Sequence, residues 1–246
     1  MLQLTGPSSC ISSPRKIFYD LFRVLEASRA LLYNEETILS QECWLRFQKT
    51  LSSEKSQWDP MEEIITLMIH TSCFSLRAND LVEKIPEPER FTNPSVALLA
   101  AEGLVVQDQI YNWHSKTLLQ LLKDDPDDYL NLALLYYHAL LIFLSGNFDY
   151  FSYWDHIPAP IIDHLEAILD RSDDLLLHSK IPGVMLFFPV TVAGSRVRFD
   201  NQKSRVLDLL DRVFCKGFVV ANRVRDGLLV RWAERDRRER EFCSMG

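Results

Sequence analysis

Glycine is scarce in this chain, with only 8 among 246 residues. So few glycines disfavour a β-sandwich, whose many tight turns favour residues that adopt a positive φ. The five cysteines form no C-x-x-C pair, which argues against a zinc site, and without a secretory signal they indicate reduced thiols. No apolar run reaches the roughly 18 residues of a membrane-spanning helix, so we expect no membrane contact.

Sequence motifs that are typical of known catalytic sites are missing as well. The sequence has no glycine-rich phosphate loop, no H-E-x-x-H pair and no G-x-S-x-G turn. It therefore identifies no catalytic residue, and we expect neither a metal nor a cofactor. Positive charge is not in excess, because the net charge is −7. Surfaces that bind nucleic acid are more often basic, so we expect no direct binding of nucleic acid.

Helical periodicity is what the sequence does contain. Apolar residues recur at three- and four-residue steps after Pro14, and Asp59-Pro60 and Pro94 have the form of helix starts. The proline-rich stretch IPEPERFTNP separates two such helices. We predict an all-α fold of stacked helical hairpins, with residues 1–13 disordered and residues 14–246 forming one helical domain.

One predicted helix, LNLALLYYHALLIFL, is apolar on nearly every face. A helix of this kind lies inside a protein, surrounded by other helices. We predict a buried central helix at Leu130–Leu144, with a start at Asp125-Pro126 and an end at Ser145-Gly146-Asn147.

His138 lies in the middle of this apolar helix. A buried imidazole needs a hydrogen bond, so His138 is either a core residue bonded to a backbone carbonyl or part of a pocket wall. Polar-tipped aromatic side chains lie before and after the helix, and a second histidine follows it; these residues suit an apolar pocket with a few directing hydrogen bonds. The candidate ligand-binding residues are Trp113, His138, Tyr153, Trp154 and His156. His164, which follows Asp163, is interpreted as a surface or helix-cap residue, with an acid–base or ligand role as the alternative.

The stretch IPGVMLFFPVTVAGSRVRF is apolar and is interrupted by Gly183, Pro189 and Gly194. Together with RKIFYDLFRVLEASRALL near the N-terminus, and with Trp58-Asp59-Pro60 followed by LMIHTSCFSLRA, it resembles the fungal-specific transcription factor domain. That domain is the helical effector region which follows a zinc-cluster DNA-binding domain in many fungal regulators. The resemblance extends over nearly the whole chain.

The resemblance implies that the apolar half of this stretch is buried between helices, and that its glycines and proline allow bends. Arg196 either caps or pairs at the next helix, or it contacts an anion or another ligand. The six closely spaced cysteines that precede this domain in such regulators are not found in these 246 residues. We therefore expect no zinc cluster and no DNA recognition of the usual kind.

Two functions from different classes fit these observations. The first is an effector domain, linked to a secondary-metabolite gene cluster, that binds a hydrophobic small molecule or a protein partner in the nucleus or cytoplasm. The second is a cofactor-independent enzyme of terpenoid or polyketide biosynthesis, of the cyclase or Diels-Alderase type. Such a reaction depends on shape, desolvation and one or two hydrogen bonds, so the lack of a catalytic motif does not exclude it.

Overall fold

The regular elements of this protein are all helices in the part of the chain that the structure describes. A computed structural model describes residues 13–54, 58–90, 92–122, 127–151 and 161–244. In chain order the elements are α2 (Ser13–Tyr33), η2 (Ile38–Ser40), α3 (Glu42–Glu54), α4 (Pro60–Lys84), α5 (Glu87–Arg90), α6 (Pro94–Leu121), α7 (Asp128–Phe151), α8 (Ile161–His178), η3 (Gly183–Leu186), α9 (Phe187–Arg196), α10 (Asp200–Cys215) and α11 (Val220–Ser244). The predicted all-α class is confirmed. The predicted disordered N-terminus lies almost wholly outside the described residues.

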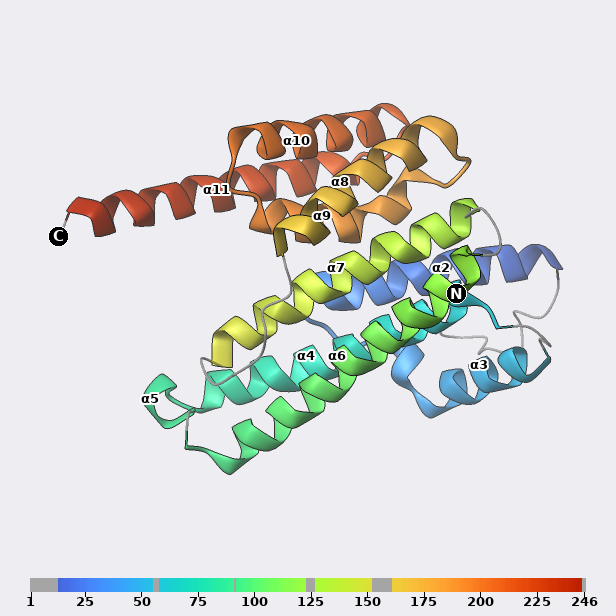
Figure 1. The fold of residues 1–246 in the computed structure, drawn as a ribbon, viewed down its shortest axis with the longest axis horizontal. Coiled ribbons are helices and arrows are strands. Elements are labelled where there is room, and N and C mark those ends of the chain that lie inside the picture. Colours follow the sequence, from blue (N-terminus) through green and yellow to red (C-terminus); the bar gives the residue numbers. More distant parts are fainter. Residues whose placement is uncertain (1–12, 55–57, 91, 123–126, 152–160, 245–246) are drawn as a thin grey trace.

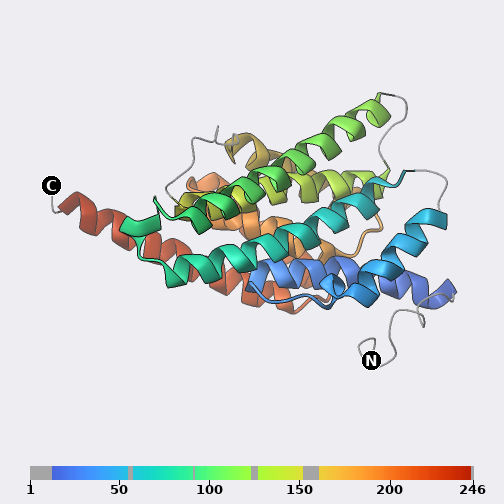
Figure 2. The same cartoon turned by 90° about the horizontal axis from the view of Figure 1, so that it is seen from below.

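Helix α7 runs through the middle of the molecule (Figure 1). It packs against α4 and α6 on one side and against α8 and α9 on the other. Seen from below, α4 lies between α6 and α2, and it contacts both of them (Figure 2). Helices α10 and α11 pack on each other and on α9, while the C-terminal part of α11 projects beyond the other helices (Figure 1). The stacked hairpins thus surround one central helix.

The prediction of a buried central helix at Leu130–Leu144 is confirmed. Leu132, Leu135 and Ala139 have no exposed surface, and Tyr136 has none either. The segment Asp128–Asn147 is also long and apolar enough to cross a membrane, but 72% of that window is buried inside the protein. Its apolar character on every side is explained by the four helices that cover it.

The predicted end of this helix is wrong, because α7 continues through Ser145-Gly146-Asn147 to Phe151. Ser145 and Asn147 are buried, and Gly146 lies under a guanidinium: a Cβ there would be 2.5 Å from Nη2 of Arg196. These small residues fit the close packing at this point of α7. A glycine lowers the stability of a helix by only about 1 kcal/mol, so the helix can continue through Gly146. At the other end the backbone N–H of Leu130 donates to Oδ1 of Asp127 at 2.7 Å, while Asp125-Pro126 lies outside the described residues.

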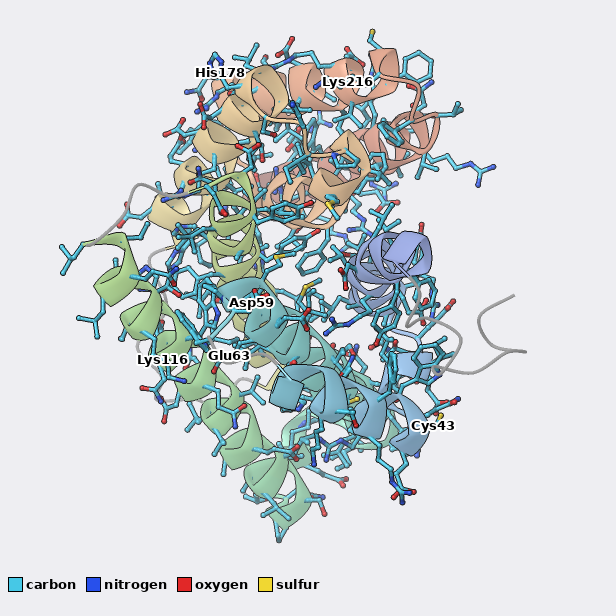
Figure 3. The ribbon with its side chains drawn as sticks, turned by 90° about the vertical axis from the view of Figure 1, so that its right-hand side faces the viewer. Cys43, Asp59, Glu63, Lys116, His178 and Lys216 are labelled. Atoms are coloured by element: carbon cyan, nitrogen blue, oxygen red, sulfur yellow. The ribbon has the colours of Figure 1, made fainter. Side chains whose placement is uncertain are left out.

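Two other predicted helix starts are confirmed by their capping geometry. Oδ1 of Asp59 accepts the backbone N–H groups of Met61 and Glu62 at 3.0 and 3.3 Å, and Pro60 occupies the first turn of α4. Asn93 caps α6 in the same way, directly before Pro94. Near the start of α4, Glu63 pairs with Lys116 of α6 at 3.1 Å, which ties the two helices together (Figure 3).

Most of the stretch Ile181–Phe199 is helical, with the 3-10 helix η3 leading directly into α9. Phe187, Phe188 and Val190 are buried as expected, but Pro189 lies in the first turn of α9 and the helix passes through Gly194. Gly194 serves close packing, because a Cβ there would lie 2.6 Å from Cδ1 of Leu228 in α11. The Trp232 indole N–H also donates to the carbonyl of Gly194 at 2.8 Å. The expectation that Pro189 and Gly194 permit bends is wrong.

Candidate functional site

His138 forms a hydrogen bond that joins the central helix to α8. Its Nδ1 lies 2.8 Å from Nδ1 of His164. A hydrogen bond between two imidazole nitrogens requires one donor and one acceptor, so the two neutral rings have opposite tautomers. The hydrogen-bond partner of His138 is therefore a second histidine rather than the backbone carbonyl that the sequence suggested, and a place in a pocket wall stays a prediction.

Aromatic rings from α6 and α7 continue from this pair. The ring of His114 stacks on Tyr137 with centroids 4.2 Å apart and an interplanar angle of 6°. Trp113 stacks on the same tyrosine at 5.9 Å, and Tyr137 meets His138 edge-on at 5.0 Å. We call these five residues the imidazole–aromatic cluster: Trp113, His114, Tyr137, His138 and His164. Its members come from three helices that are distant in sequence.

The electrostatic surroundings keep the three imidazoles neutral. Burial is the main cause that lowers the pKa of His138 to about 3, and His164, Arg171 and His114 contribute to this shift. Burial is also the main cause of the lowered pKa values of His164 and His114. The Arg171 guanidinium donates to Oδ1 of Asn131 at 2.9 Å and stays beside the cluster. Burial raises the pKa of Tyr137 to about 12, so this phenol also stays uncharged.

The outer nitrogens of the histidine pair have no hydrogen-bond partner in the part of the chain that the structure describes. Neither Nε2 makes a hydrogen bond to the described residues, and neither is among the completely buried polar atoms. Because the tautomers are opposite, one Nε2 carries a hydrogen and the other carries a lone pair. The pair can therefore donate to a carbonyl and accept from a hydroxyl, with aromatic surface alongside. The same arrangement can hold or pass one proton.

The structure places two of the five candidate residues in this cluster. Trp113 has no exposed surface, and its indole N–H donates to the carbonyl of Pro60 at 3.0 Å. It therefore contacts the cluster through its ring rather than through its polar end. Tyr153, Trp154 and His156 lie outside the described residues. Ligand binding by all five residues remains a prediction.

His114, Tyr137 and His164 are the members that the sequence reasoning missed. His164 is only 8% exposed, which differs from its interpretation as a surface or cap residue. Its spacing carries the signal: His164, Ile168 and Ser172 recur every four residues along α8, and all three are buried. A histidine that shares a helix face with buried residues is itself expected to be buried, and a buried imidazole needs a hydrogen-bond partner.

Metal ligands do not gather in this region. Across the ranges that the structure describes, no three His, Cys, Asp or Glu side chains could hold a metal ion together. The fold and the cluster define an all-helical domain with a buried polar–aromatic centre. The family model for the fungal specific transcription factor domain matches residues 1–243, and the chain belongs to this family. No curated protein and no solved structure shows a significant match to the chain.

Proposed function

We propose that this chain is the effector domain of a fungal transcriptional regulator, and that it responds to an uncharged, largely apolar small molecule. Family membership supports the regulatory role. The proposal of a ligand is supported mainly by the neutral His138–His164 pair. Its two Nε2 atoms have no hydrogen bond to the described residues, and Tyr137 lies beside it.

The chemistry of the pair favours a ligand with a hydroxyl or carbonyl group on a hydrophobic body. An anion would lack a protonated imidazole to pair with, because His138 stays neutral at physiological pH, and of the charged groups named here it would have Arg171 alone to attract it. A cation would face the nearby Arg171, which disfavours it electrostatically. Terpenoid- and polyketide-like compounds of a secondary-metabolite pathway have the required character. A protein partner is the alternative occupant.

Regulation by this chain would act through a partner that contacts DNA. The net charge of −7 does not favour direct DNA binding. A nuclear or cytoplasmic location fits the family. A gel shift with the purified chain at a stated salt concentration tests this point, and a sequence-specific shift would contradict it.

An enzyme is the second candidate, and the same histidine pair favours it. Two neutral imidazoles that share one hydrogen bond could donate and accept a proton during a cyclisation. Such a role needs no cofactor, and its substrate would be the same class of hydrophobic molecule.

Deletion of the gene, followed by metabolite and transcript profiles, separates the two functions. A regulator predicts loss of the whole pathway together with its transcripts. An enzyme predicts accumulation of one late intermediate while the transcripts persist, and that outcome would overturn the regulatory proposal.

A further inference from the structure

A separate cavity opens at the start of α8, where α9, the following linker, α10 and α11 converge. Its volume is about 360 Å³, which lies in the range of small-molecule sites. The lining residues are Ile161, Ile162, Leu165, Ser195, Arg196, Arg198, Phe199, Gln202 and Arg235. None of them belongs to the imidazole–aromatic cluster.

Three of the lining residues are arginines from three different segments: Arg196 ends α9, Arg198 lies in the linker and Arg235 belongs to α11. No acidic side chain is among the lining residues in the part of the chain that the structure describes. The whole chain carries a net charge of −7, so a cavity lining whose charged residues are arginines differs from its overall balance. A guanidinium is a strong hydrogen-bond donor to a carboxylate, so a wall that contains arginines suits an anion.

Each of the three arginines has a neighbour outside the cavity lining. Nη2 of Arg235 donates to the backbone carbonyl of Val197 at 2.6 Å. Arg196 is packed against Gly146 of α7, where a larger residue would collide with it. Arg198 has its nearest acidic partner, Glu239, at 3.9 Å, and both side chains are largely exposed. That distance is too long for a hydrogen bond, so Glu239 holds Arg198 only weakly.

The other side of the cavity is apolar. The first turns of α8 contribute Ile161, Ile162 and Leu165. Phe199, the residue directly before α10, adds an aromatic ring to the lining. Ile162 is 63% exposed and Phe199 is 60% exposed, so both leave apolar surface open to a bound molecule. Burial of that surface against a hydrocarbon body is favourable.

We propose that this cavity binds a small amphipathic carboxylate. Its apolar body lies against Ile162, Leu165 and Phe199, and its carboxylate is held by Arg198 and Arg235, since the fork geometry of a guanidinium suits two parallel hydrogen bonds. This site goes beyond the proposed effector site, because it has different residues and takes a ligand of different charge.

The test is calorimetric titration of the whole chain with decanoate, with decanol, acetate and inorganic phosphate as comparison probes. We expect saturable 1:1 binding of decanoate, and binding of decanol, acetate and phosphate at least about tenfold weaker, since each lacks one of the two interactions. Equal affinity for decanol would overturn the role of the arginines. Equal affinity for acetate or phosphate would overturn the role of the apolar wall.

Two exposed variants test the arginines without disturbing the core. Arg198→Gln should weaken decanoate binding about tenfold, as expected for a lost hydrogen bond to a charged group. Glu239→Gln should strengthen it about two- to fivefold, because a competing carboxylate is removed. Arg77→Gln, at an exposed arginine that pairs with Glu102, is the matched control and should leave the affinity unchanged. Unchanged affinity in Arg198→Gln, or an equal loss in Arg77→Gln, would overturn the proposal.

The variant His138→Phe separates this proposal from the effector site. Decanoate affinity should be the same in His138→Phe and in the parent chain, since His138 does not line the cavity. A loss of decanoate binding in His138→Phe would assign decanoate to the imidazole–aromatic cluster and overturn the arginine site, while leaving the regulatory proposal to its own tests.

Discussion

Nδ1 of His138 and Nδ1 of His164 lie 2.8 Å apart, so the central helix and α8 share a hydrogen bond between two neutral imidazoles. This contact links positions 26 residues apart in the sequence. It fixes the orientation of both rings, and with it the direction in which their outer nitrogens point.

A double-mutant cycle measures the strength of this contact. His138→Phe and His164→Phe should each lower the free energy of unfolding by about 1–2 kcal/mol, because each leaves one buried Nδ1 without its partner. The double variant should lose less than the sum of the two, by about 1 kcal/mol. Urea denaturation provides the measurement. Additive losses would show that the two imidazoles do not interact in solution.

Acidification should destabilise the protein through His138. Its pKa is about 3 in the folded chain and about 6.5 in an unfolded chain, so between these values only the unfolded state binds the proton. The free energy of unfolding should therefore fall as the pH drops from about 6.5, by about 1.4 kcal/mol per pH unit from this one group. His164 and His114 have lowered pKa values and act in the same direction, while Asp163 opposes the shift at His164.

Urea midpoints at pH 7 and pH 5 test this pH dependence. In His138→Phe the loss of stability on acidification should be smaller than in the parent chain. An identical loss in both proteins would show that His138 already accepts a proton in the folded state.

Two glycines give opposite predictions for the same substitution. Gly194→Ala brings a Cβ to within 2.6 Å of Leu228, and we expect a loss of about 1–3 kcal/mol from overpacking. Gly227→Ala in α11 meets nothing within 4 Å, and it should stabilise the protein by up to about 1 kcal/mol through helix propensity. Thermal unfolding of both variants is the measurement. Equal effects would contradict the close approach of α9 and α11.

The partly buried ion pair between α2 and α4 should be costly to break. Arg23 is 1% exposed, and its Nη1 donates to Oε2 of Glu62 at 2.6 Å. Glu62→Gln removes the balancing charge, and we expect a loss of about 3 kcal/mol. Glu42→Gln, in the exposed pair with Arg46, is the matched control and should cost less than about 0.5 kcal/mol. Similar small losses in both variants would show that Arg23 is hydrated in the folded protein.

The sequence was sufficient where local chemistry decides the structure. Asp59-Pro60 and Asn93-Pro94 begin helices because capping groups act within three residues, and the all-round apolar character of Leu130–Leu144 predicts its burial. Features that depend on contacts between residues far apart in the chain could not be predicted from the sequence. Helix α7 continues through Gly146 because Arg196, 50 positions away, packs on it, and His164 is buried because His138 accepts or donates one hydrogen bond.

The central claim is that this domain controls transcription in response to a hydrophobic small molecule at the imidazole–aromatic cluster. The most direct test fuses the chain to a heterologous DNA-binding domain in a fungal host and measures reporter expression with and without an organic extract of the metabolite-producing culture. We expect a reporter response to the extract, its loss in His138→Phe, and its retention in Gly194→Ala, which should be destabilised at least as much but lies outside the cluster. Reporter expression that ignores the extract, or an undiminished response in His138→Phe, would contradict the claim.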